Sequence, residues 1–307
     1  MRPDRTRSMN PDVGWPIWSG ERAQRVEDAL EHALPAAGES TPPLRAAMRY
    51  AVLGSGKRVR ALLAYASGEL AEADAGDVDH AAVAVELIHA YSLIHDDLPC
   101  MDDDVLRRGK PTCHVAHGEA MALLAGDALQ TLAFEVLAKA PLSHTQMQAR
   151  AQIALLAEAA GSRGMAGGQA LDLSHVGDAL SLNELERMHA LKTGALIQAS
   201  VRLGAGCGRR FDRAEGDALD RYAAAVGLGF QVVDDVLDVE GTAQSLGKTA
   251  GKDAMQGKPT YVSLLGLDAA KERVAALRDE AHAALLGFGS KSRRLNELAD
   301  WIALRKS

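Results

Sequence analysis

The chain has 307 residues, with 34 Lys and Arg against 41 Asp and Glu, and a formal net charge of −7. This acidic balance disfavours a general nucleic-acid-binding role, because proteins that bind the phosphate backbone carry a basic excess. The three cysteines, Cys100, Cys113 and Cys207, have no CxxC spacing, so we expect no disulfide framework, no four-thiolate zinc site and a reducing, cytoplasmic location.

The opening segment, MRPDRTRSMNPDVG, contains arginines but no apolar stretch behind them, so we expect no secretory signal. We expect residues 1–20 to form a flexible tail and residues 21–307 to form one domain, because no proline-rich or Gly/Ser linker divides the rest. The apolar stretches 81–94 and 120–140 are interrupted by acidic residues and fall short of the ~18 to 20 uninterrupted apolar residues that a membrane span needs, so no span is predicted.

The chain is rich in Ala and Leu and has Gly or Pro at helix-length intervals. This pattern favours an all-α fold. A helix is predicted over 42–53, with Thr41 as N-cap, Pro42 in the first turn and Gly54 as the C-terminal glycine. Another is predicted to start at Ser181, which has capping-box spacing to Glu184.

A third helix is predicted from about Asp79 to Asp97, because Leu87, Tyr91 and Ile94 recur at helical spacing and give a packed face. It leads into the first of two aspartate clusters, LIHDDLPCMDDDVLRRGKPT over 93–112. Pro99 predicts a kink or break of this helix before Asp102.

The second cluster, FQVVDDVLD over 230–238, places Asp234 and Asp238 four residues apart, so on a helix their carboxylates share one face. Asp235 is adjacent, and Gln231 lies one turn earlier. Crowded carboxylates repel one another unless a cation neutralises them. All-oxygen ligands suit Mg²⁺, which commonly completes its coordination with substrate phosphate oxygens, so the clusters predict Mg²⁺ together with a diphosphate.

Basic residues near the clusters strengthen this interpretation, since a phosphate held by metal on one side is commonly held by Lys or Arg on the other. His89 lies about 10 Å before Asp96 on the same helical face and could hold a second anion. The other candidates are Lys57, Arg60, Arg107, Arg108, Lys192 and Lys258.

With these motifs the chain resembles the all-trans polyprenyl diphosphate synthases, and most closely the bacterial farnesyl diphosphate synthases. The resemblance rests on DDLPCMD (96–102) followed by RRGKPT, on FQVVDDVLD, and on GSGKRVR, LIHAYSLIHDD, AGGQALDL, HALKTGALI and GKDAMQGKPTY in order along the chain. It implies an all-α, single-domain bundle of antiparallel helices around a deep central cleft, which is usually a homodimer. The implied cofactor is Mg²⁺, as three ions, with Mn²⁺ as an alternative.

The resemblance also implies a role for each matching residue. Asp96, Asp102 and Asp234 would bind Mg²⁺, supported by Asp97, Asp235 and Asp238. Arg107, Lys192 and Lys258 would hold an allylic diphosphate, and Lys57, Arg60, His89 and Arg108 would hold isopentenyl diphosphate. Thr193 and Gln231 would direct oxygen dipoles at an allylic cation, and Lys192, Thr193, Gln231, Asp96, Asp102 and Asp234 would form the catalytic set.

The implied reaction condenses isopentenyl diphosphate with dimethylallyl or geranyl diphosphate to give farnesyl diphosphate. Tyr91 and Ser92 lie one to one and a half turns before Asp96, where a bulky side chain would stop chain growth at C15. A C20 product and a catalytically silent binding subunit stay open as alternatives. A terpene cyclase is disfavoured, because it needs no second diphosphate site.

Overall fold

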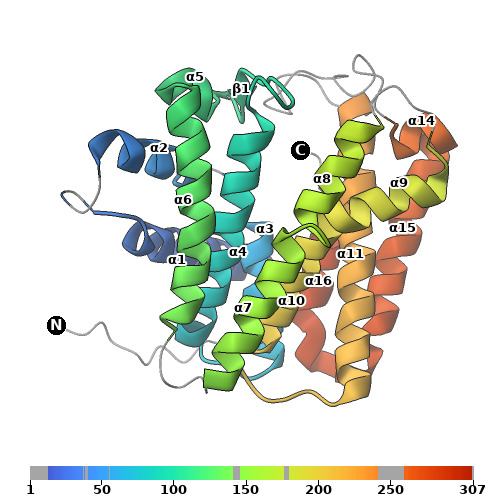
Figure 1. The fold of residues 1–307 in the computed structure, drawn as a ribbon. Coiled ribbons are helices and arrows are strands. Elements are labelled where there is room, and N and C mark those ends of the chain that lie inside the picture. Colours follow the sequence, from blue (N-terminus) through green and yellow to red (C-terminus); the bar gives the residue numbers. More distant parts are fainter. Residues whose placement is uncertain are drawn as a thin grey trace.

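A computed structural model of the protein describes residues 13–36, 38, 41–54, 56–140, 146–175, 180–240 and 259–305, and almost all of its regular elements are helices (Figure 1). The first half contains α1 (Trp15–Ala33), α2 (Pro42–Val52), α3 (Val59–Leu70), α4 (Ala75–Asp96), α5 (Cys113–His117), α6 (Glu119–Ala138) and α7 (Gln146–Ala160). The second half contains α8 (Met165–Ser174), α9 (Leu182–His189), α10 (Ala195–Ala205), α11 (Arg213–Glu240), α14 (Tyr261–Leu265), α15 (Leu267–Ala284) and α16 (Arg293–Leu304). The predicted all-α class is confirmed.

In the described part of the chain, four short elements lie between the α-helices. A π-helix, η1 (Ala190–Gly194), joins α9 to α10, and a 3₁₀ segment, η2 (Leu286–Ser292), precedes α16. Strands β1 (Leu106–Arg107) and β2 (Lys110–Pro111) form an antiparallel hairpin with Arg107 opposite Lys110. Figure 1 shows this hairpin at the same end of the bundle as the C-terminus.

Helix α4 lies at the centre of the N-terminal half and packs against α3, α6 and α10. Its buried residues, which include Val83, Leu87 and Ile88, occupy nearly every face, as is typical of a core helix. Helices α3 and α10 approach closely at Gly204, where an added Cβ would lie 2.0 Å from the carbonyl oxygen of Ala64. Packing of α4 from several sides fixes the direction in which its last residue, Asp96, leaves the core.

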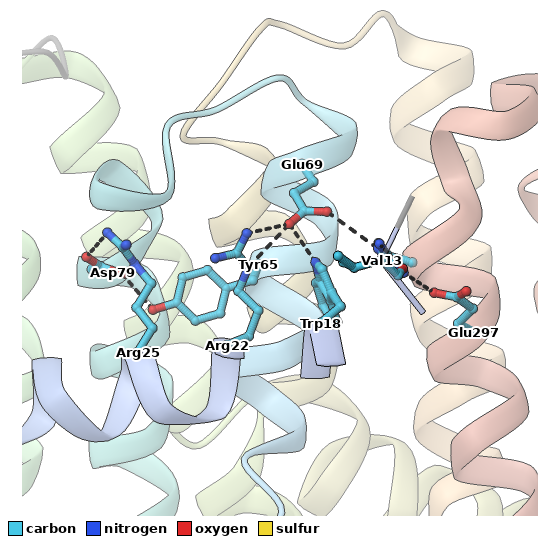
Figure 2. A network of polar contacts seen from close by, with 9 residues as sticks. Val13, Trp18, Arg22, Arg25, Tyr65, Glu69, Asp79 and Glu297 are labelled. Carbon is cyan, nitrogen blue, oxygen red and sulfur yellow. Dashed lines mark hydrogen bonds and ion pairs between the residues drawn. The ribbon is translucent and has the colours of Figure 1, made fainter. Parts of the chain in front are cut away.

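The folded chain begins earlier than the predicted boundary at residue 21, because α1 starts at Trp15. Trp18 is 3% exposed and donates from Nε1 to Glu69 at 2.7 Å. Arg22 also donates to Glu69, and Arg294 donates to the carbonyl of Val13 at 2.9 Å (Figure 2). The two tryptophans of WPIW therefore belong to the domain, and the expected tail before residue 13 lies outside the described residues.

The local helix signals are confirmed at three places. Helix α2 begins at Pro42 after the N-cap Thr41, although the threonine side chain makes no capping hydrogen bond, and Gly54 has a left-handed φ of 71°. Ser181 and Glu184 form the predicted capping box of α9. Helix α4 ends at Asp96, before Pro99.

Among the described helices, α6 alone is long and apolar enough to cross a membrane, and 33% of its most apolar 18-residue stretch is buried. Helix α6 packs along α4, as a core helix does. Its apolar composition alone therefore does not indicate a membrane span. Leu123 and Leu124 stay exposed on its outer face.

Candidate active site

The first aspartate cluster folds back on itself where α4 ends. The backbone N–H of Asp102 donates to the carbonyl oxygen of Asp96 at 2.8 Å, and that of Asp104 donates to the carbonyl of Asp97 at 3.2 Å. Because Pro99 cannot continue a helix, these turn bonds replace the helical ladder. They bring Asp96 and Asp102 together at one end of the bundle, as the sequence predicts.

Asp96 lies in an environment that disfavours its charge. Burial raises the pKa of its carboxyl to about 6, and the neighbouring carboxylate of Asp102 adds to that effect, whereas Lys192 opposes it. Lys192 comes from η1, so the electrostatic interaction links the first aspartate cluster to a different part of the chain. A cation placed beside Asp96 and Asp102 would relieve this penalty.

Asp97 points to a different partner. It is 3% exposed, and both of its oxygens accept from Arg107 Nε at 2.9 Å, while Arg107 Nη2 donates to Oδ1 at 2.6 Å. Arg107 lies on β1, next to a two-residue turn in which Arg108 and Gly109 have φ values of 53° and 75°, as a type I′ hairpin requires. The buried carboxylate therefore holds the hairpin and its guanidinium against the end of α4.

The π-helix η1 carries Lys192 and Thr193. A Cβ at Gly168 would lie 2.1 Å from the backbone nitrogen of Lys192, so α8 approaches η1 as closely as backbones can. One turn after Gly168, Asp172 accepts a hydrogen bond from Lys192 Nζ at 2.5 Å. The motif AGGQALDL thus supplies both the close approach and the counter-ion, and Asp172 is a site residue to which the sequence analysis gave no role.

The second aspartate cluster lies on α11 and meets η1 through another pair of small residues. A Cβ at Gly227 would lie 3.1 Å from the Cα of Gly194. One turn later, Gln231 accepts from Thr193 Oγ1 at 3.1 Å and donates from Nε2 to Asp235 at 3.2 Å. Asp235 and Asp238 are buried, which leaves Asp234 as the more accessible carboxylate of the cluster.

Asp234 is bound to a cation from the C-terminus that the sequence analysis did not identify. Arg305 donates from Nη2 to Asp234 Oδ1 at 2.7 Å and to the carbonyl of Phe230 at 2.9 Å. Its guanidinium carbon also lies 4.0 Å from the centre of the Phe230 ring. No local pattern in the sequence links these positions, because the contact arises only when α16 packs against α11.

Arg108 lies within electrostatic range of Lys57, Arg60 and His89, the other three residues that the resemblance assigns to isopentenyl diphosphate. Burial lowers the pKa of Arg60 to about 10, with Arg108 adding to the effect, and burial also lowers the pKa of Lys57. Burial and the neighbouring guanidiniums of Arg60 and Arg108 lower the pKa of His89 well below its ordinary value. The buried Nε of Arg60 has no hydrogen-bond partner. Lys57, Arg60 and Arg108 form a cation cluster, with His89 beside it. A bound anion would stabilise the charged forms of these residues.

Arg58, between Lys57 and Arg60 on the chain, does not join this cluster as a free cation. It donates to Glu27 at 2.8 Å and to Glu86 at 3.1 Å, and its φ of 51° is left-handed. Glu86 also accepts from the backbone nitrogen of Ala61. The contacts of Arg58 and Glu86 therefore connect α1, α3 and α4.

Tyr91 and Ser92 lie on α4, before Asp96. Tyr91 is buried, and its ring makes an edge contact with His95 at 5.7 Å. Gln130 of α6 lies near enough to the Tyr91 hydroxyl to affect its pKa, and α4 and α6 pack together. Ser92 donates to the carbonyl of His89.

Lys258 lies outside the described residues, so its predicted role is not placed. Within the described part of the chain, no group of three His, Cys, Asp or Glu side chains stands close enough to hold a metal ion by itself. The two aspartate clusters therefore contribute their carboxylates from separate elements.

Comparison with known proteins identifies the family. The Polyprenyl synthetase family matches residues 41–284. The chain is 47% identical over 286 residues to farnesyl diphosphate synthase of Escherichia coli, which covers 92% of this chain and 96% of that protein. It is 46% identical over 291 residues to a chloroplastic geranylgeranyl pyrophosphate synthase of Capsicum annuum, covering 94% and 78%.

A solved structure supports the same assignment. The geranyltransferase of Helicobacter pylori, complexed with magnesium and isoprenyl diphosphate, superimposes with a TM-score of 0.82 at 32% identity and covers 95% of this chain and 97% of that one. The family match extends over well over half of the sequence and includes the end of α4, η1 and α11, on which the two aspartate clusters, Lys192 and Thr193 lie. The chain belongs to the Polyprenyl synthetase family.

Proposed function

We propose that the protein is a farnesyl diphosphate synthase, which condenses isopentenyl diphosphate with dimethylallyl or geranyl diphosphate and releases diphosphate. The observation that carries this proposal is the presence of two separate kinds of charge at one site. Asp96 is a carboxylate whose pKa is raised by burial, and Arg60 is a cation whose pKa is lowered by burial. Each is destabilised as it stands, and a metal-bound diphosphate beside a second diphosphate would stabilise both.

The carboxylates fit Mg²⁺ as the metal. Mg²⁺ prefers oxygen ligands and commonly completes its coordination with phosphate oxygens of the substrate. We expect three metal ions, with Mn²⁺ as the alternative to Mg²⁺. The direct ligands would be Asp96, Asp102 and Asp234, and the supporting residues would be Asp97, Asp235 and Asp238. When bound, Mg²⁺ would neutralise the diphosphate of the allylic substrate and favour its departure.

Side chains of this chain would do the rest of the chemistry. Lys192, held by Asp172, and Arg107, held by Asp97, present fixed cations to the allylic diphosphate. As the C–O bond ionises, these cations stabilise the charge that develops on the leaving group. The double bond of isopentenyl diphosphate attacks the allylic cation, and the proton lost in that step goes to the released diphosphate.

The cation cluster of Lys57, Arg60 and Arg108, with His89 beside it, favours elongation over cyclisation. A terpene cyclase ionises one diphosphate and has no need for a second anion site. A silent binding subunit would not need both aspartate clusters, and both are intact here. In a labelled assay, release of diphosphate from geranyl diphosphate should therefore require isopentenyl diphosphate. Rapid release of diphosphate in the absence of isopentenyl diphosphate, together with cyclic or alcohol products, would contradict elongation.

A C15 product is supported by Tyr91, whose buried ring lies about one and a half turns before Asp96 on α4. The second candidate is a C20 product, which is favoured by the similarity to a relative named a geranylgeranyl pyrophosphate synthase. The length of the elongated product decides between the two.

We also propose a homodimer in the cytoplasm. Leu123 and Leu124 on α6 and Val115 on α5 are about half exposed, and these two helices pack together. An apolar face of this kind is typical of an interface, and a second copy would cover it.

Light scattering should give twice the mass of one chain for the wild type. For Leu124→Glu the measured mass should fall to that of one chain. The matched control Leu286→Glu, at an exposed leucine of η2, should leave the dimer intact. A wild-type monomer would contradict the proposal.

A further inference from the structure

A chain of hydrogen bonds runs from Asp235 to Thr193 and has one fixed direction. Gln231 Nε2 donates to Asp235 Oδ1 at 3.2 Å, and Thr193 Oγ1 donates to Gln231 Oε1 at 3.1 Å. The second oxygen of Asp235, Oδ2, accepts from the backbone nitrogen of Tyr261 at 2.8 Å. Three elements, η1, α11 and the start of α14, meet at these bonds.

The direction follows from the chemistry of the groups. An ionised carboxylate only accepts hydrogen bonds, so the Gln231 amide must turn its NH₂ toward Asp235 and its oxygen toward Thr193. A carbonyl oxygen also only accepts, so the Thr193 hydroxyl must donate its one hydrogen to Gln231. Toward any other neighbour, Thr193 Oγ1 then presents only lone pairs.

The π-helix explains why the hydroxyl is available for this bond. In an ordinary helix a threonine hydroxyl often donates to a carbonyl three or four residues earlier. In η1 the threonine hydroxyl instead reaches Gln231, which the close approach of Gly227 to Gly194 brings within range. Sites with a π-helical turn are frequently functional.

We infer that Asp235 is a positioning residue that acts through Gln231 to fix the direction of the Thr193 hydroxyl. This inference rests on the proposed function, in which Thr193 faces an allylic cation. An oxygen that presents only lone pairs stabilises that cation, whereas a hydroxyl hydrogen turned toward it would repel it. Asp235 is 3% exposed and accepts hydrogen bonds through both oxygens, so it would support the site in this way and not as a direct ligand of the metal.

The substitution Asp235→Asn tests the inference, because it reverses the direction of the bonds. The N–H of Tyr261 still requires an acceptor, so the new amide places its oxygen there and turns its NH₂ toward Gln231. The Gln231 amide must then flip, and its own NH₂ faces Thr193. We expect kcat for elongation to fall on the order of 10²-fold. The KM for isopentenyl diphosphate, the Mg²⁺ affinity measured by calorimetry and the unfolding midpoint should stay unchanged.

A second substitution should restore the direction. In the double variant Asp235→Asn with Gln231→Glu, the new carboxylate accepts from the asparagine NH₂ and from the Thr193 hydroxyl, and the total charge equals that of the wild type. We expect most of the lost kcat to return, although Gln231→Glu alone places two carboxylates side by side and lowers it. In a Thr193→Val background, Asp235→Asn should have no further effect on kcat, because no hydroxyl remains to be turned.

Two results would overturn the inference. One is weaker Mg²⁺ binding by Asp235→Asn, which would make Asp235 a metal ligand. The other is a double variant no faster than the single one, which would make the role of Asp235 purely structural. Failure of the proposed function has a different signature, since the wild-type protein itself would then not elongate an allylic diphosphate.

Discussion

Arg305 and Asp234 form an ion pair at 2.7 Å between the C-terminus and the second aspartate cluster, and the side chain of Arg305 is only 6% exposed. The guanidinium occupies a carboxylate that the proposed function assigns to Mg²⁺. A cation held by the chain and a cation from solution therefore compete for the same oxygen atom.

Arg305→Gln should strengthen binding of Mg²⁺ in the absence of diphosphate, because it removes the competing charge. The Asp234 side chain is 40% exposed, so solvent screens its pairing with Arg305, and we expect the dissociation constant to fall on the order of fivefold in calorimetry. Arg221 is an exposed arginine on α11, the helix that carries Asp234. The control variant Arg221→Gln should leave the dissociation constant for Mg²⁺ unchanged. Unchanged or weaker binding by the Arg305 variant would show that the pair does not compete with the metal.

Asp96→Asn should make the metal-free protein more stable at neutral pH. The carboxyl of Asp96 has a pKa of about 6 in the folded protein against an ordinary 3.8, so the folded state binds more protons between these values. Stability therefore falls as the pH rises from about 4 to 6, and the full penalty, about 3 kcal/mol at most, is present above pH 6. The asparagine removes this penalty but also the proposed metal ligand.

Denaturant unfolding at pH 8 and pH 5 without metal measures this effect. The gain in unfolding free energy for Asp96→Asn should be larger at pH 8 than at pH 5, and elongation should be lost. Asp127→Asn, at an exposed position of α6, should give no such gain. A variant less stable than wild type at pH 8 would mean that Asp96 contributes favourable contacts in the metal-free state.

Local signals were predictable from the sequence because they depend on neighbours along the chain. Pro42 at the start of α2, the capping box at Ser181 and the end of α4 before Pro99 are of this kind. The aspartate clusters and the family were identified on the same basis, from motifs, and the family is confirmed.

Contacts between distant elements were not predictable. HALKTGALI has the composition of a continuous helix, and its π-helical turn forms where α8 and α11 press against it through glycines. The pairing of Lys192 with Asp172 follows from that packing, since Gly168 sets the distance between the two helices. The boundary at residue 21 was wrong because the sequence around Trp18 does not indicate that Glu69 of α3 and Arg294 of α16 contact its indole ring.

Two neighbouring arginines should respond to substitution in different ways. Arg58→Leu breaks a buried ion pair and leaves Glu86 without its cation, so we expect a loss of about 3 to 5 kcal/mol in unfolding free energy. Arg60→Leu should leave stability equal or higher, because its buried guanidinium already has a pKa lowered to about 10.

In the Arg60 variant the loss should appear in the KM for isopentenyl diphosphate, on the order of 10-fold or more, as expected for a lost charged hydrogen bond. The KM for geranyl diphosphate should change little. Steady-state kinetics with each substrate varied in turn measures this difference. Equal increases in both KM values would contradict the assignment of the cation cluster to one substrate.

Tyr91→Ala should lengthen the product, because it opens space beside α4 where the growing chain is expected to end. We expect C20 and longer diphosphates in place of C15, sized by chromatography after phosphatase treatment. Tyr91→Phe keeps the ring and should keep the C15 product, although it removes the hydroxyl group. If the alanine variant gives the same product length as wild type, Tyr91 does not limit chain growth.

The most direct test of the account is to incubate the purified protein with labelled isopentenyl diphosphate and geranyl diphosphate, with Mg²⁺ or with a chelator, and to size the product. The account predicts a C15 diphosphate as the main product, formed only when Mg²⁺ is present. Formation of no elongated product with Mg²⁺ present, or equal elongation in the chelator, would contradict it.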